Sequence, residues 1–174
     1  MTFLLKKVIS GGQTGADLGG LLAARELGFE TGGTAPKGWL TETGPEKDLL
    51  RSFGLVECEQ KGFPARTRRN VETASATLLV GPYRTGGSRL TYQVAQELKK
   101  PLFLLPFPSS ADADHDRCWH WLERYSVQVL NVAGNRESQS PGIGAFTRDF
   151  LVSALRKGKR RRNWTLPSSR KGGQ

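Results

Sequence analysis

The chain has only two cysteines, Cys58 and Cys118, in 174 residues. This is not the dense disulfide framework of a small secreted domain, and it favours free thiols in a reducing compartment. No stretch approaches the roughly 18 consecutive apolar residues that a membrane span needs. The N-terminal apolar run is short and interrupted by lysines, unlike a signal peptide. We therefore expect a cytoplasmic protein with no membrane contact.

Histidine is almost as scarce, and His115 and His120 lie in one short stretch with Cys118. This spacing is too tight for an ordinary zinc site, and no second group of His or Cys completes one. Two neighbouring histidines also leave little room for a Ser-His-Asp triad, and the G-x-S-x-G motif is absent. We expect no protein-ligated metal and no serine-hydrolase chemistry.

Acidic residues are missing from the C-terminal end. The formal net charge is +10, from 26 Lys and Arg against 16 Asp and Glu. Residues 156–174 hold eight of the basic residues and no acid, which leaves 18 against 16 in residues 1–155. A block of like charge is typical of a solvated, flexible end. We expect one domain over 1–155 and a basic, flexible tail over 156–174, with nucleic acid as the lesser interpretation of the tail.

Short apolar runs alternate with amphipathic segments through residues 1–155. The patterns predict strands at 6–10, 55–59, 76–81, 102–107 and 127–132, and helices at 16–28, 65–75, 89–100, 116–125 and from about Pro141. Strands separated by helices indicate βαβ units and a mostly parallel sheet that is covered on both faces. The predicted fold class is α/β, a single doubly wound domain.

Three glycine-containing loops each follow a predicted strand and precede a predicted helix. They are residues 11–15, 81–88 and 133–142. In a parallel sheet such loops share the carboxyl edge, where open α/β folds bind ligands. Glycine lets the backbone approach a ligand, and the start of the next helix attracts anions. Neither a dinucleotide fingerprint nor a P-loop is present, so the pattern predicts a phosphate site of another type.

Five motifs together resemble the putative molybdenum carrier family, the molybdenum-cofactor carrier proteins. They are "VISGGQTGAD", "GGTAPKG", "TRRNVETASATLLVG", "TGGSRLT" and "LNVAGNRESQSPGI", in that order between about Val8 and Leu155. The family is a Rossmann-like domain related to the Lonely Guy phosphoribohydrolases and the DNA-processing A proteins. The resemblance implies a carrier for the molybdenum cofactor (molybdopterin), a pterin that bears a phosphate, and a homo-oligomer, either dimer or tetramer.

The candidate ligand-binding residues come from the loops and the adjoining helix faces. They are Gly11, Gly12, Gln13, Thr14, Gly15, Asp17, Lys37, Asn70, Thr85, Gly86, Gly87, Ser88, Arg136 and Ser138. Several have a purely structural alternative. Asp17 stands in a first helical turn, where the helix dipole favours a carboxylate. The resemblance places Lys37 at the ligand, but its alternative is an exposed loop lysine. For Arg136 and Ser138 the alternative is that they close their loop and do not contact the ligand. Arg66, four residues before Asn70, shares its helix face.

A relative offers a test for catalysis. Lonely Guy enzymes carry P-G-G-x-G-T-x-x-E, whose glutamate serves cleavage of an N-glycosidic bond. The stretch "TGGSRLTYQ" keeps the two glycines but has Gln93 where that acid would be. An uncharged amide cannot act as a carboxylate base, which favours binding without turnover. The alternative is a nucleotide or nucleotide-sugar N-glycosidic hydrolase that uses Asp17 or Glu72 as the acid.

Overall fold

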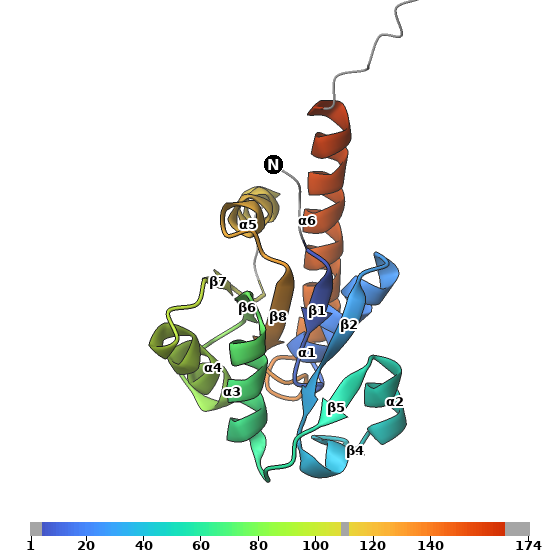
Figure 1. Ribbon diagram of the computed structural model, residues 1–174, viewed down its shortest axis with the longest axis vertical. Coiled ribbons are helices and arrows are strands. Elements are labelled where there is room, and N and C mark those ends of the chain that lie inside the picture. The colour runs from blue at the N-terminus through green and yellow to red at the C-terminus, as the bar shows by residue number, and fades with distance from the viewer. Residues whose placement is uncertain (1–4, 109–111, 166–174) are drawn as a thin grey trace, which may run out of the picture.

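The computed structural model describes residues 5–108 and 112–165 and contains a six-stranded sheet with helices on both faces (Figure 1). The strand order is β5-β2-β1-β8-β6-β7, and all pairings within this sheet are parallel. The strands are β1 (Lys7–Ile9), β2 (Glu30–Ala35), β5 (Leu55–Glu57), β6 (Ala76–Val80), β7 (Leu102–Leu105) and β8 (Val129–Gly134). This arrangement confirms the predicted α/β, doubly wound, Rossmann-like fold.

Helices α3 and α4 cover one face of the sheet, and α1, α5 and α6 cover the other (Figure 1). The helices are α1 (Ala16–Glu26), α2 (Lys47–Ser52), α3 (Phe63–Thr73), α4 (Gly86–Glu97), α5 (Asp112–Arg124) and α6 (Ile143–Thr165). A single 3-10 turn, η1 (Lys37–Trp39), leads into a small hairpin of β3 (Leu40–Thr41) and β4 (Gly44–Pro45).

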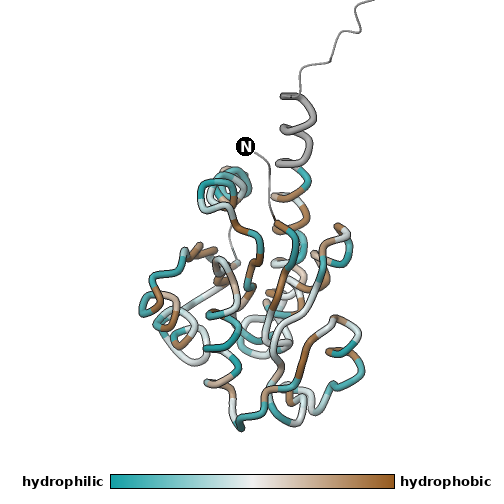
Figure 2. The backbone as a smooth tube through the Cα atoms, in the orientation of Figure 1, coloured by the Kyte–Doolittle hydropathy of each residue, from teal (hydrophilic) through white to brown (hydrophobic). Residues whose placement is uncertain are grey.

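The core lies on the α1, α5 and α6 side and reaches through the sheet. All five residues of β6 are buried, and Leu78, Leu130 and Leu151 have no exposed surface. Figure 2 shows the apolar residues gathered along the central strands. A smaller cluster of Val71, Val94 and Ala95 joins α3 to α4. Burial on both faces explains why these strands read as continuous apolar runs.

The sequence patterns missed β2, the hairpin and α2. The β2 sequence "ETGGTA" lacks the β-branched and aromatic residues that mark most strands. Gly33 has φ +125°, and a Cβ there would lie 2.1 Å from the carbonyl oxygen of Ser10. Only glycine fits at this point, because β2 lies so close to the loop after β1. Glycine is also rare in strands, so the same residue made the strand hard to predict from the sequence.

Helix α6 continues past the predicted domain boundary. Its backbone is helical to Thr165, ten residues beyond Leu155, and Figure 1 shows this end projecting past the sheet. The rest of the predicted tail, 166–174, lies outside the described residues. Between residues 5 and 165, apart from the gap at 109–111, no helix is both long and apolar enough to cross a membrane.

Candidate functional site

A cavity of about 850 Å³, here called the edge cavity, lies where the loops after β1, β6 and β8 meet the start of α3. All three loops leave the carboxyl edge of the parallel sheet, as predicted. Seven of the predicted binding residues line it: Gln13, Asp17, Thr85, Gly86, Gly87, Ser88 and Arg136. Phe63, Arg66 and Thr67 complete the wall from α3.

The start of α4 is open to this cavity. Thr85 precedes the helix but makes no capping hydrogen bond with its side chain. A Cβ added at Gly86 or at Gly87 would meet no atom within 4 Å apart from its neighbouring residues and the backbone of its own helix. The N–H groups of a first helical turn have no partner within the helix, and the dipole makes this end positive. Bare backbone, unused donors and open space therefore coincide at Gly86 and Gly87.

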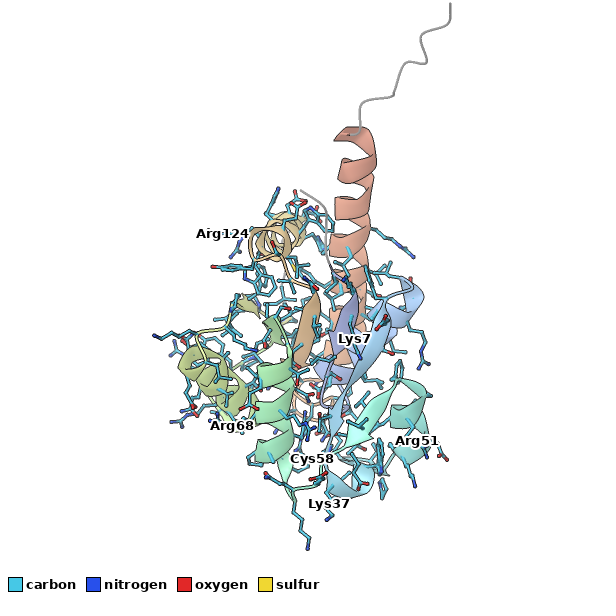
Figure 3. The ribbon with its side chains drawn as sticks, viewed as in Figure 1. Lys7, Lys37, Arg51, Cys58, Arg68 and Arg124 are labelled. Carbon is cyan, nitrogen blue, oxygen red and sulfur yellow. The ribbon has the colours of Figure 1, made fainter. Side chains whose placement is uncertain are left out.

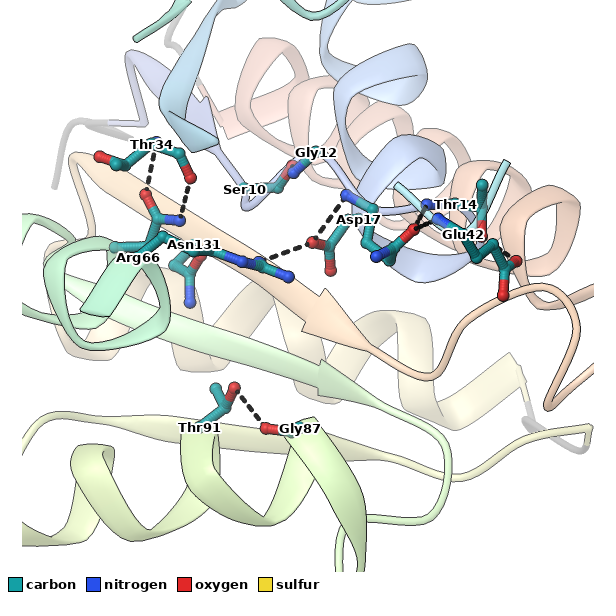
Figure 4. A network of polar contacts seen from close by, with 12 residues as sticks. Ser10, Gly12, Thr14, Asp17, Thr34, Glu42, Arg66, Gly87, Thr91 and Asn131 are labelled. Carbon is teal, nitrogen blue, oxygen red and sulfur yellow. Dashed lines mark hydrogen bonds and ion pairs between the residues drawn. The ribbon is translucent and has the colours of Figure 1, made fainter. Parts of the chain in front are cut away.

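Asp17, which is buried, and Arg66, which is half-buried, form an ion pair on the opposite wall (Figure 4). A guanidinium nitrogen of Arg66 lies 3.2 Å from Oδ2 of Asp17, which also accepts a hydrogen bond of 3.2 Å from the backbone N–H of Gln13. Burial raises the pKa of Asp17, and the charge of Arg66 opposes that rise. The guanidinium occupies the space beside Gly11, only 1.2 Å from where a Cβ would stand. The glycine at position 11 therefore makes room for Arg66.

Gln13 connects the first loop to the small hairpin. Its Oε1 accepts hydrogen bonds from the backbone N–H groups of Thr14, at 3.1 Å, and Glu42, at 2.8 Å. Its Nε2 is buried and has no partner among the described residues, and the same is true of Nε of Arg66. An unpaired buried donor costs roughly 1–3 kcal/mol. Both side chains line the edge cavity, where an acceptor atom of a ligand would remove that cost.

The carboxylate of Glu42 accepts hydrogen bonds from the hydroxyl groups of two predicted binding residues. Thr14 and Ser138 both donate to it through their side chains, and the backbone N–H of Ser138 donates at 3.2 Å. Thr14, Gly15 and Ser138 line a separate cavity of about 520 Å³ beside α1, not the edge cavity. Glu42 was absent from the sequence candidates because it lies in a four-residue turn with no periodic pattern around it.

The other candidates lie outside both cavities. Asn70 accepts a hydrogen bond from the N–H of Thr34 at 2.8 Å and donates to its carbonyl at 3.0 Å, which ties α3 to β2. Gly12 has φ +74° and faces α2 and β5, where a Cβ would lie 2.8 Å from leucine side chains. Lys37 is exposed in η1, near the lower edge of Figure 3. Their binding roles stay predictions, and the contacts found here are structural.

The two proposed acids differ in position. Asp17 lines the edge cavity, whereas Glu72 is exposed on α3 and lies 3.7 Å from Arg68. Gln93, which the sequence comparison aligned with the glutamate of Lonely Guy enzymes, is exposed on the other face of α4 and does not line the edge cavity. Asp17 is therefore the carboxyl group placed to meet a ligand there.

We expect Glu42→Gln to destabilise the protein by about 1 kcal/mol at neutral pH, because charge-assisted hydrogen bonds that join the hairpin to two loops are weakened. These hydrogen bonds hold the pKa of Glu42 below its ordinary value. The stabilisation is then present above the unfolded-state pKa and is lost as pH falls through the lower folded-state pKa. Denaturant unfolding at pH 7 and in mild acid measures the difference. Glu59→Gln, at an exposed position, is the control, and an equal effect there would contradict the assignment.

Comparison with known proteins gives a consistent result. Residues 8–155 match a family described as the circularly permutated YpsA SLOG family. A solved structure of a putative molybdenum carrier protein from Syntrophus aciditrophicus is 34% identical, with a TM-score of 0.80 over 87% of this chain and 95% of that one. No curated protein matches. These findings confirm the resemblance to molybdenum carrier proteins, and the chain belongs to the circularly permutated YpsA SLOG family.

Proposed function

We propose that the protein is a carrier that binds a phosphorylated small molecule in the edge cavity without turnover, and that this molecule is the molybdenum cofactor. The observation that supports the proposal best is the open start of α4, where Gly86 and Gly87 leave space and unused N–H donors. Such a helix start is suited to a phosphate group. The name of the Syntrophus protein favours a molybdenum-containing ligand.

Each wall of the edge cavity then has a role. The first turn of α4 binds the phosphate, and Arg136, which lines the cavity, adds charge-assisted contacts. The unpaired Nε2 of Gln13 donates to an acceptor on the pterin. Within residues 5–108 and 112–165 no group of three or more His, Cys, Asp or Glu could hold a metal ion. In this proposal molybdenum stays on the sulfur atoms of the pterin and is transported as cargo.

The decisive measurement is mass spectrometry of the small molecules that denaturation releases from the purified protein. The proposal expects a pterin phosphate at close to one per chain, and calorimetric titration of stripped protein with molybdopterin should restore binding. If a nucleotide is released instead, and if the protein consumes it on incubation, the protein is an enzyme and the carrier proposal is wrong.

One observation favours the enzyme as a second candidate. Asp17 is a buried carboxyl group in the edge cavity and its pKa is raised, as suits a general acid. The reaction would be hydrolysis of an N-glycosidic bond in a nucleotide. Chromatography over a panel of nucleoside monophosphates should detect base release, and Asp17→Asn should slow it by about 10²–10⁴-fold. Glu72→Gln, outside the cavity, is the matched control.

The remaining expectations of location and partners are proposals of the same kind. We propose a cytoplasmic protein that forms a homodimer or homotetramer, with no membrane contact and no role for nucleic acid in carrying the ligand. Light scattering during size-exclusion chromatography measures the oligomeric state. Truncation of the chain after Arg156 should leave ligand binding intact and lower any affinity for nucleic acid, which weakens steeply with salt where Lys and Arg carry it.

A further inference from the structure

A third cavity lies on the other face of α4 from the edge cavity. Its volume is about 350 Å³, and it is lined by Tyr83, Arg84, Arg89, Tyr92 and Gln93. Tyr83 and Arg84 come from the loop after β6, and the other three share one face of α4 through i, i+3 and i+4 spacing. Ser88 and Thr91 face the edge cavity instead. We call this third cavity the tyrosine–arginine pocket.

The tyrosine–arginine pocket has positive charge that the protein does not neutralise. Neither Arg84 nor Arg89 has a carboxylate partner among the described residues, and no acidic residue lines the pocket. Arg68 on α3 is a contrast, because it lies 2.7 Å from Glu97 on α4. A guanidinium group without a partner is the preferred protein group for two parallel hydrogen bonds to phosphate. The pocket is therefore suited to a phosphate-bearing ligand.

The pocket also has a fixed aromatic wall. The rings of Tyr83 and Tyr92 stack, with their centroids 4.9 Å apart and their planes inclined by 26°. Both side chains are half-buried, so their rings are held at the pocket surface. Any of the planar nucleobases can stack on such a surface, because each of them has an aromatic face. The amide of Gln93 can both donate to and accept from the edge of that base.

We propose that the tyrosine–arginine pocket binds a nucleoside monophosphate, with the base against the tyrosine pair and the phosphate between Arg84 and Arg89. Its volume is at the lower end of the range for small-molecule sites, which suits one nucleotide rather than a strand. The site is separate from the edge cavity, and it does not depend on what the edge cavity binds.

Isothermal titration calorimetry of the full chain with AMP, adenosine and ribose 5-phosphate tests this proposal. AMP should bind at least about tenfold more tightly than either part, because stacking and phosphate contacts both contribute. Arg84→Ala and Arg89→Ala should each weaken AMP binding by about 10- to 100-fold. Tyr92→Leu should abolish the preference for AMP over ribose 5-phosphate, and Tyr92→Phe should keep it.

Two controls place the binding. Arg51→Ala removes an arginine from α2, on the opposite side of the molecule (Figure 3), and should leave AMP binding unchanged. Gly87→Val, which blocks the edge cavity, should also leave it unchanged. AMP binding that survives both arginine variants but is lost in Gly87→Val would assign the nucleotide to the edge cavity and overturn the proposal. Equal affinity for AMP and ribose 5-phosphate, or far tighter binding of a single-stranded ten-nucleotide DNA, would overturn it too.

Discussion

Gly87→Val should lower the affinity for the phosphorylated ligand at least about a hundredfold and leave the free energy of unfolding nearly unchanged. Apart from its neighbouring residues and the backbone of α4, the Cβ of the new residue would have no atom within 4 Å, so the fold accommodates it. The same space is where a phosphate would meet the first N–H groups of α4. Loss of two charge-assisted hydrogen bonds, each worth about 1.5–3 kcal/mol, accounts for the expected size. Calorimetric titration and denaturant unfolding measure the two quantities.

Gly12→Val is the contrasting variant, because both glycines were predicted to bind the ligand. Gly12 has φ +74°, and its Cβ would lie 2.8 Å from side chains of Leu50 and Leu55. Valine there is strained in its backbone and overlaps α2 and β5, so the expected loss is of folding. Gly87→Ala should weaken binding less than valine does. Unchanged affinity in Gly87→Val with intact folding would mean that the start of α4 does not bind the ligand.

The fold could be predicted from the sequence wherever burial produces a pattern. Strand β6 is apolar at all five positions and buried on both faces, and α4 carries its buried residues at helical spacing. The hairpin offers no such signal, since each of its strands has two residues. Strand β2 was missed for a different reason, because Gly33 is required by its contact with Ser10. The sequence shows a glycine at position 33 but does not show the backbone atom that would clash with a larger residue there.

The position of the edge cavity was predictable from the sequence, and the separate roles of the glycines around it were not. The three glycine-containing loops predicted a cavity at the carboxyl edge of the sheet, since loops after parallel strands meet there, and the edge cavity lies at that edge. The sequence could not distinguish a glycine that leaves space for a ligand from one that is needed because another part of the protein packs against it. Gly11 accommodates Arg66, and a Cβ on Gly15 would lie 2.5 Å from the carbonyl oxygen of Asn135. Gly86 and Gly87 alone among the loop candidates have open space beside them.

The second large effect concerns the ion pair between Asp17 and Arg66. Arg66→Met should destabilise the protein by about 3–5 kcal/mol at pH 7, because it leaves a carboxylate buried without its partner. Asp17 is only 3% exposed, so its carboxylate has little contact with bulk water. The double variant Asp17→Asn/Arg66→Met should recover much of the loss, since no buried charge is then left unpaired. Denaturant unfolding of the two single variants and the double variant gives the coupling energy of the pair.

The pH dependence of the stability of Arg66→Met distinguishes a loss of charge pairing from a loss of packing, because packing alone does not depend on the ionisation of Asp17. Burial already raises the pKa of Asp17 above its ordinary value of 3.8, and Arg66 is the main charge that opposes this. Without Arg66 the folded-state pKa of Asp17 should rise further. A group with a raised pKa stabilises fully below the unfolded-state pKa, and this stabilisation is lost as pH rises through the folded-state pKa. The deficit of Arg66→Met relative to the natural chain should therefore shrink in mild acid. A deficit that is constant from pH 7 to pH 4, or a double variant no more stable than Arg66→Met, would show that Arg66 acts through packing and not through the charge of Asp17.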